Sequence, residues 1–321
     1  MANEIGSGAS VAQEALVFSP IRAPSFRSAL AGAWAPWAKR PLGVIGAVVI
    51  ALAFVLAILA PLIAPYDPNE FVGRRLESPD GAHVLGTNLL GQDMLSRTIF
   101  GAQVSIGIAL SSTIIGVGLG TILGVISAYY GGWLDLAVQR LMEVIASFPG
   151  LILVLMIVAA LGRPSGAREG NLLVLMWDLR SLSIAIAAGL IFGVMRVIRS
   201  AVLKERSLPY VEAAKTIGAG PIRIMFRHIL PNVFPYVIVT FSSIIGFIIL
   251  LEAGISFLGY GVSIGTPSWG ADLSGRNRDF FMSAPWVMLG PGVALTLTVM
   301  GANFLGDTLR DILDPRLRGS R

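Results

Sequence analysis

Long uninterrupted apolar runs constrain this chain more than any other feature of its sequence. About 20 apolar residues in a helix, rising about 1.5 Å each, cross a hydrocarbon layer of roughly 30 Å. Charged residues make up only 13% of the chain, against roughly 25% in soluble proteins. The sequence therefore predicts an all-α integral membrane protein with six transmembrane helices. The six runs are about Leu42–Ala64, Val104–Tyr129, Leu136–Leu161, Leu182–Leu203, Val233–Leu258 and Pro285–Leu305.

Basic residues predict which side of the membrane each loop occupies. If both termini are inside, the three lysines (Lys39, Lys204 and Lys215) are inside, and only eight of the 24 lysines and arginines are outside. Because positive charges collect in cytoplasmic loops, we expect both termini to be cytoplasmic. Residues 1–40 would then form a cytoplasmic N-terminal tail, and residues 41–321 a six-helix transmembrane domain. The net charge of +5 reflects this asymmetry and is no sign of nucleic-acid binding.

The absence of several motifs argues against familiar kinds of catalysis. The sequence has no GxxxxGK[ST] phosphate loop and no lysine that follows a glycine, so the chain cannot bind ATP in the P-loop manner. It has no cysteine, only two histidines and no HExxH motif. We therefore predict no catalytic, cofactor or metal site on this chain.

A glycine run, GVGLGTILG at 116–124, lies inside the second apolar run. It follows no strand, so it does not fit the context of a dinucleotide-binding loop. Gly116, Gly120 and Gly124 recur every four residues and so share one helix face. Small residues there allow a neighbouring helix to approach closely. That neighbour could belong to this chain or to another subunit.

One polar segment, 204–232, separates the fourth and fifth apolar runs. Ser207 is expected to cap a first helix, and Gly218 to end it in a left-handed conformation. Pro221 can open a second helix, which should stop near Pro231 because proline clashes with the preceding turn. The pattern predicts a hairpin of two short helices on the cytoplasmic side.

Such a hairpin is suited to enter a groove on another protein. Ala213 and Ala214 keep the first helix thin, and Ile222, Met225 and Ile229 offer an apolar stripe at helical spacing. The alternative is that the hairpin only links two spans and lies on the membrane surface.

The hairpin also carries a specific resemblance. EAAKTIG followed by HILPN resembles the EAA loop of permease subunits in bacterial ABC importers, where it is the loop that couples to the ATPase. His228 stands where the family usually has isoleucine, with Ile229 beside it, a departure typical of the peptide and nickel branch. The matching positions are Glu212, Ala213, Ala214, Gly218, Leu230 and Pro231.

Three other segments are similar to the C-type permease of dipeptide, oligopeptide and nickel importers. They are HVLGTNLLGQDMLSRTIFGAQVSIGIAL at 83–110, TPSWGADLSGR at 266–276 and GDTLRDILDPRLRG at 306–319. The first departs from the branch with Asn88 where aspartate is usual and Gln92 where arginine is usual.

The resemblance implies a type I ABC importer permease fold with a cytoplasmic coupling-helix hairpin. It implies as partners a second homologous permease, two cytoplasmic ATP-binding subunits that hold ATP and magnesium, and an extracytoplasmic solute-binding protein, in the bacterial inner membrane. Di- and oligopeptides are the expected cargo, with nickel chelates, haem and other small solutes as alternatives. A secondary transporter that needs no ATPase is the competing class, although no repeat between the two halves is found.

Polar residues within spans are candidates for lining the pathway, because such groups usually face protein or a water-filled cavity. Glu252 lies in the fifth run and Asn303 in the sixth. Glu252 could instead bond the backbone at a helix irregularity near Gly254. The external segment 65–103 has two interpretations as well: it braces the bundle, or it docks the solute-binding protein.

Overall fold

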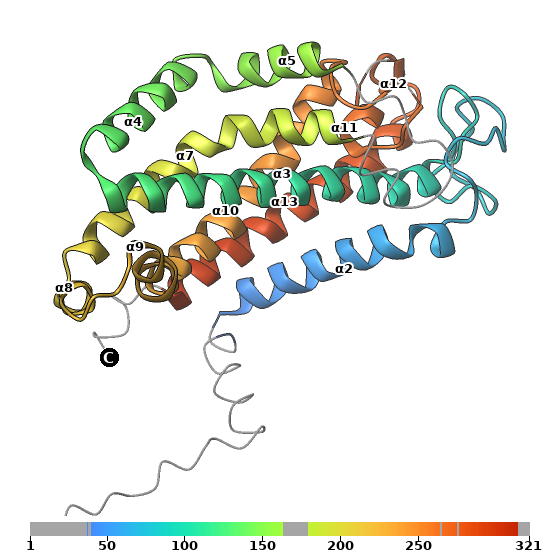
Figure 1. The fold of residues 1–321 in the computed structure, drawn as a ribbon. Helices are drawn as coiled ribbons and strands as arrows, with labels where there is room; N and C mark the ends of the chain where they lie inside the picture. Colours follow the sequence, from blue (N-terminus) through green and yellow to red (C-terminus); the bar gives the residue numbers. More distant parts are fainter. Residues whose placement is uncertain (1–36, 38–39, 163–178, 264, 275, 314–321) are drawn as a thin grey trace, which may run out of the picture. The chain divides into compact units, whose positions relative to one another are not determined.

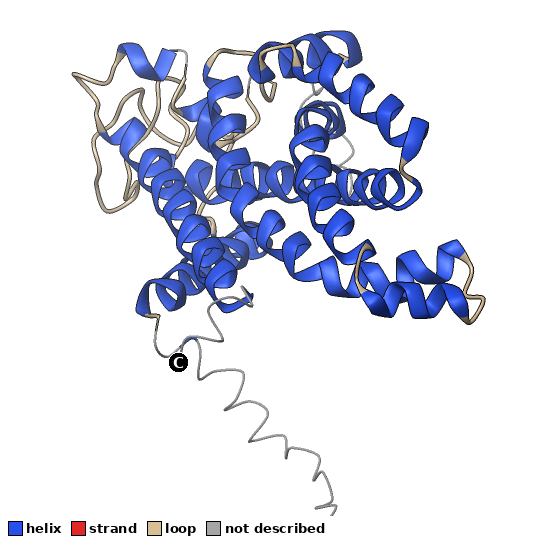
Figure 2. Cartoon of the chain, turned by 90° about the vertical axis from the view of Figure 1, so that its left-hand side faces the viewer, coloured by secondary structure: helices blue, strands red, loops and turns tan. Residues whose placement is uncertain are grey.

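The structure is a computed structural model that describes Trp37 and residues 40–313, apart from 163–178, 264 and 275. The described residues from Arg40 onward belong to one compact unit. They form helices joined by loops, without a β-strand among them (Figure 2). The all-α prediction is thus confirmed for the described part, whereas the predicted tail, 1–40, lies almost wholly outside it.

Five helices of the described part are long and apolar enough to cross a membrane, and each overlaps one predicted run. Helix α3 begins earlier than expected, at Met94, because the Asp93 carboxylate accepts a hydrogen bond from the Ser96 amide at 2.7 Å and so caps it. The five, which run roughly alongside one another in Figure 1, are α2 (Pro41–Ile63), α3 (Met94–Tyr130), α7 (Arg180–Arg206), α10 (Leu230–Phe257) and α13 (Trp286–Leu313).

The third predicted run is broken in two. Helix α4 (Gly132–Ala146) and helix α5 (Gly150–Leu161) meet at a bend of 89°, so the prediction of one straight helix is wrong. Pro149 is the physical reason: it has no N–H for a helical bond, and it disfavours helical geometry in the residue before it. If the bent pair crosses the membrane together, it is the sixth span.

Helices α3 and α7 form the most extensive helix pair, and the glycines of α3 make it possible. A Cβ on Gly116 would lie 3.1 Å from the Leu190 Cβ, and one on Gly120 would lie 2.8 Å from the Val194 Cβ. These distances are shorter than ordinary contacts, so a Cβ on either glycine would require α7 to shift. The predicted glycine face is therefore a packing surface, and its neighbour belongs to this chain.

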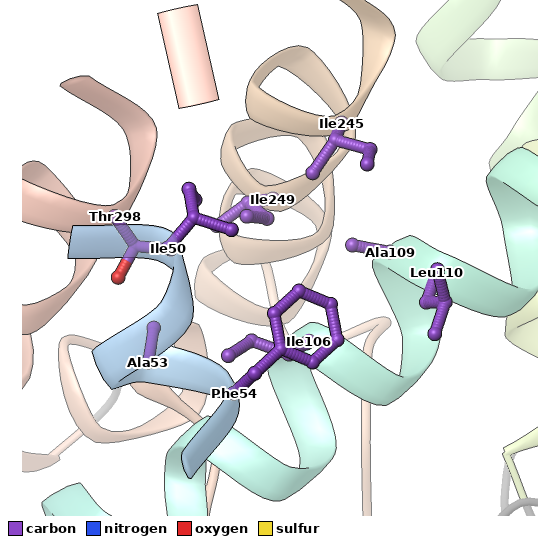
Figure 3. A pocket seen from close by; sticks show the side chains of 9 residues that line it. All are labelled: Ile50, Ala53, Phe54, Ile106, Ala109, Leu110, Ile245, Ile249 and Thr298. Carbon is purple, nitrogen blue, oxygen red and sulfur yellow. The ribbon is translucent and has the colours of Figure 1, made fainter. Parts of the chain in front are cut away.

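Helix α2 packs on α13 and α3 and leaves a largely apolar outer face. Between α2, α3, α10 and α13 lies a small apolar recess, shown in Figure 3 with Phe54, Ile106 and Ile249 on its walls. Its one hydroxyl, on Thr298, is already used in a 2.8 Å hydrogen bond to the Ala294 carbonyl. The recess therefore presents no free polar group with which to recognise a polar solute.

Segment 65–103, which is predicted to be external, is tied to the bundle by buried polar contacts. The Arg97 guanidinium on α3 donates to one oxygen of Asp272 from Nε at 2.9 Å and from Nη2 at 2.7 Å. Asp272 lies on the short helix α11 (Trp269–Asp272). Burial raises the pKa of the Asp272 carboxyl, and the Arg97 charge opposes that rise. This ion pair braces the loop before α13 against the start of α3.

A second contact in the segment involves the two residues that depart from the branch. The Asn88 amide donates to the Gln92 side-chain oxygen at 2.8 Å, and that oxygen also accepts from Arg97 at 3.1 Å. All three side chains are buried. The bracing role of the external segment is visible in these bonds, whereas a docking role stays a prediction.

Candidate docking hairpin

The hairpin starts with helix α8 (Pro209–Thr216), which has its proline in the first turn. Ser207 does not cap it. The Ser207 hydroxyl donates backward to the Lys204 carbonyl at 2.8 Å and completes α7, so the capping prediction is wrong. Leu208 occupies the N-cap position because the residue before a proline is driven to an extended conformation, here with ψ at 147°.

Gly218 ends α8 as predicted. Its φ is +81°, in the left-handed region. The Ala219 amide donates to the Ala214 carbonyl at 3.0 Å, and the Gly218 amide donates to the Lys215 carbonyl at 2.9 Å. These two bonds make a Schellman motif, which satisfies the last carbonyls of the helix. Only glycine adopts this conformation without strain.

The second helix begins at Pro221, as predicted. The prediction that it stops near Pro231 is wrong. Helix α9 (Pro221–Arg223) passes into a π-helical segment, η1 (Ile224–Ile229), and directly into α10. In the wider π turn the Leu230 amide donates to the Met225 carbonyl, five residues back. The wider turn brings Pro231 into the first turn of α10, where its missing N–H costs little.

The inner face of the hairpin anchors it to the bundle. Val211 and Ala214 of α8 and Met225 and Ile229 of η1 are buried, and they pack with side chains of α3 and α7. The predicted outward stripe through Met225 and Ile229 is therefore wrong. A helix that folds back on a bundle buries whichever apolar face meets it, and the hairpin sequence alone does not say which face that is.

The outer face carries a different set of side chains. Glu212 and Ala213 are exposed, and so are three large apolar side chains: Ile217 (84%), Ile222 (69%) and Phe226 (55%). Exposed apolar side chains gathered on one short element are typical of interaction sites. We call these three the exposed apolar residues of the hairpin. Leu230 is half-buried and Pro231 is exposed at the start of α10.

Polar contacts fasten the hairpin to two spans. The Tyr210 hydroxyl donates to Glu205 at 2.7 Å and accepts from the Asn232 amide at 3.0 Å. Burial and the bond to Glu205 raise the pKa of Tyr210. The Arg206 guanidinium donates to the Ala128 carbonyl at 2.9 Å. The bonds of Tyr210 thus join α8 to α7 and α10, and the bond of Arg206 joins the end of α7 to α3. The sequence analysis did not find the bond between Tyr210 and Asn232, because 22 residues separate them and Asn232, the last residue of the HILPN run, had been given no role.

The two residues named as candidates for the pathway have different surroundings. Glu252 is fully buried, and its carboxylate accepts from Ser256 at 2.7 Å and from Ser105 at 3.0 Å. It therefore joins α10 to α3 by side-chain bonds rather than by a bond to the backbone. Asn303 is exposed on α13.

In the described part of the chain, no group of three histidine or acidic side chains is placed so that it could hold a metal ion. The chemistry offered here is that of a contact surface: an anchored hairpin that exposes apolar side chains, the acidic Glu212 in its first turn, and the basic side chains of Lys215, Arg223 and Arg227.

Comparisons with known proteins agree with this geometry. Residues 120–319 match the family described as binding-protein-dependent transport system inner membrane component. Residues 28–79 match the N-terminal transmembrane domain of oligopeptide transport permease C.

Full-length relatives point the same way. The chain is 35% identical over 300 residues to the glutathione transport system permease protein GsiD of Pectobacterium atrosepticum, covering 93% of this chain and 95% of the relative. It is 37% identical over 281 residues to the dipeptide transport system permease protein DppC of Alkalihalophilus pseudofirmus, covering 87% and 88%. It is also 37% identical over 275 residues to a putative peptide transport system permease protein of Brucella suis, covering 85% and 88%.

These matches extend over most of the chain, and the apolar helices make it a multi-pass protein of the inner membrane. The chain therefore belongs to the family of inner membrane components of binding-protein-dependent transport systems, in its C-type peptide permease branch, and it is a permease subunit of an ABC importer rather than an enzyme.

Proposed function

We propose that this permease imports di- or oligopeptides and is driven through the hairpin by ATP hydrolysis on separate subunits. The single observation that carries the mechanical part is the hairpin itself. Its outer face exposes Ile217, Ile222 and Phe226, while its inner face and Tyr210 are fastened to the spans. If a protein bound to the hairpin moves, the hairpin moves with it and displaces the spans.

The proposed contact residues lie on this element and at its exit. Ala213 keeps the outer face of α8 narrow, and Glu212 in the first turn offers a negative charge to a basic residue of the partner. Gly218 makes the turn, and Ala214 and Ile229 hold the helices on the bundle. Leu230 and Pro231 connect η1 to α10.

The proposed assembly contains two ATP-binding subunits that hold ATP and magnesium, a second homologous permease and an extracytoplasmic solute-binding protein. We place the hairpin and both chain ends in the cytoplasm, because lysine and arginine then collect on that side. In this assignment residues 1–40 are a cytoplasmic tail and residues 41–321 are the transmembrane domain.

Peptides are proposed as cargo because relatives of this chain carry the names of dipeptide, peptide and glutathione transport permeases. Nickel chelates, haem and other small solutes are the alternatives.

The test uses the complete complex in liposomes and measures both uptake of a panel of radiolabelled dipeptides, tripeptides and glutathione and ATPase activity stimulated by the loaded binding protein. We expect Gly218→Pro to lower both at least about tenfold, because proline holds φ near −65° and Gly218 requires +81°. Glu212→Lys should also lower both, by reversing an exposed charge at the proposed contact.

Gly220→Ala is the matched control. Gly220 lies two residues from Gly218 with an ordinary φ of −69°, and a Cβ there meets no atom within 4 Å. It should leave uptake and ATPase activity within about twofold of wild type. The coupling proposal is wrong if Gly218→Pro and Glu212→Lys behave like this control. Uptake by the permease chains without ATPase subunits would instead favour a secondary transporter.

A further inference from the structure

Arg196 is a charged side chain inside a membrane span. It lies on α7, seven residues before Leu203, where the predicted apolar run ends, or about 10 Å along the helix axis. Its side chain is exposed in this chain. A bare arginine in the hydrocarbon layer is costly, so such residues almost always face other protein or a water-filled cavity.

In the structure the Arg196 side chain does not point toward the nearer end of the span. Long basic side chains near a helix end can bend toward the lipid headgroups. The Arg196 guanidinium instead lies 4.3 Å from the centre of the Phe192 ring, one turn toward the opposite end of α7. It therefore points deeper into the membrane and away from the nearer surface.

The neighbouring carboxylates are already engaged. On α4, Asp135 accepts from Arg199 at 2.7 and 2.5 Å, and Glu143 accepts from Arg140 at 2.8 Å. Helices α3 and α5 contain no acidic residue. Within the described residues, the anion that would balance Arg196 is not supplied by any carboxylate packed near this half of α7.

The surface around Arg196 is open. Gly189 and Gly193 share its helix face, opposite the face that packs on α3, and both are exposed. A Cβ on Gly193 would meet no atom within 4 Å, whereas one on Gly189 would be in ordinary contact with Val154 of α5, at 3.6 Å. The guanidinium thus borders unfilled space, and one of its flat sides rests on an aromatic ring. Its N–H groups can form the two parallel bonds that arginine makes with a carboxylate.

We propose that Arg196 lines the transport pathway and binds the carboxylate of the cargo as it passes the half of the membrane next to the hairpin. This inference rests on the proposed function, because every peptide with a free C-terminus carries a carboxylate. Cargo binds at this site only in passing. The site selects for the carboxylate charge of the peptide and not for its side chains.

The test uses the complete complex in liposomes. We expect Arg196→Gln to lower peptide uptake about tenfold while ATPase activity stimulated by the binding protein stays within about twofold, and Arg196→Lys to retain most of the uptake. Ser200→Ala, on the same exposed face one turn away, is the control and should transport like wild type.

Chemical restoration of the charge separates recognition from structure. Because this chain has no cysteine of its own, Arg196→Cys gives it a single thiol. That thiol should react with water-soluble methanethiosulfonates during turnover, and cargo should slow the reaction. The aminoethyl reagent, which carries a positive charge, should restore part of the uptake, and the sulfonatoethyl reagent should not. Ile58→Cys, on the apolar face of α2 and 65% exposed, should not react.

Three results would overturn the inference. One is normal uptake by Arg196→Gln, and another is an unreactive Arg196→Cys. The third is loss of complex assembly in both Arg196→Gln and Arg196→Cys, which would mean that Arg196 pairs with a carboxylate of a partner subunit. If wild type itself imports no peptide of the panel, the proposed cargo is wrong; if wild type imports and these variants match it, only the role of Arg196 is wrong.

Discussion

At the residue scale, the two residues that depart from the peptide branch bond each other. Asn88 and Gln92 bond each other in a buried site beside Arg97. An amide both donates and accepts, so an amide pair keeps such a bond without burying two charges. The sequence showed two separate departures, and the structure places both residues in one buried bond.

The neighbouring Arg97–Asp272 pair provides the prediction at this scale. Both side chains are at least 95% buried. Arg97→Gln should destabilise the protein by about 3–5 kcal/mol, because it leaves a buried carboxylate without its partner. Thermal unfolding of the purified protein in detergent measures this.

The control for that prediction is Arg40→Gln, which breaks a more exposed pair with Asp311 at 3.7 Å. Exposed pairs contribute little, so its unfolding temperature should stay close to that of wild type. Equal shifts for Arg97→Gln and Arg40→Gln would show that the buried pair is not a structural brace.

At the element scale, proline and glycine decide where helices break and how closely they pack. Pro149 turns one apolar run into the bent pair α4–α5, whereas Pro231 is absorbed without a break because the π turn of η1 precedes it. The same residue type therefore has opposite outcomes. The difference lies in the hydrogen bonds of the turn before each proline, which hydropathy does not register.

The contact between α3 and α7 supplies the prediction for this scale. Gly120→Ala should destabilise the fold by about 1–3 kcal/mol, since its Cβ would stand 2.8 Å from the Val194 Cβ and overpack the interface. Gly118→Ala, two residues away on the same helix, meets no atom within 4 Å and is the matched control. Thermal unfolding of both variants tests the claim, which fails if they are equally stable.

At the scale of the whole molecule, the arrangement of spans decides which surfaces face which compartment. Ile217 on the hairpin and Met282 in the loop before α13 are 84% and 93% exposed, and the crossing helix α10 separates them along the chain. We therefore expect them on opposite sides of the membrane.

Single cysteines in this cysteine-free chain test that topology. A membrane-impermeant maleimide should label Met282→Cys in intact spheroplasts. It should label Ile217→Cys only after the spheroplasts are permeabilised. Wild type, which has no thiol, is the blank. Labelling of both positions in intact spheroplasts would contradict the proposed orientation.

The sequence by itself determined the helical fold, the approximate spans, the left-handed turn at Gly218 and the family, because long apolar runs, glycine conformation and short motifs are local properties. Only the tertiary structure decided which hairpin face is buried, that Pro149 breaks a span while Pro231 does not, and that Glu252 bonds Ser105 and Ser256. The physical reason is that burial depends on contacts between residues distant in the chain. Periodicity identifies a helix face but not the neighbour that covers it, and hydropathy identifies an apolar run but not the hydrogen bonds within it.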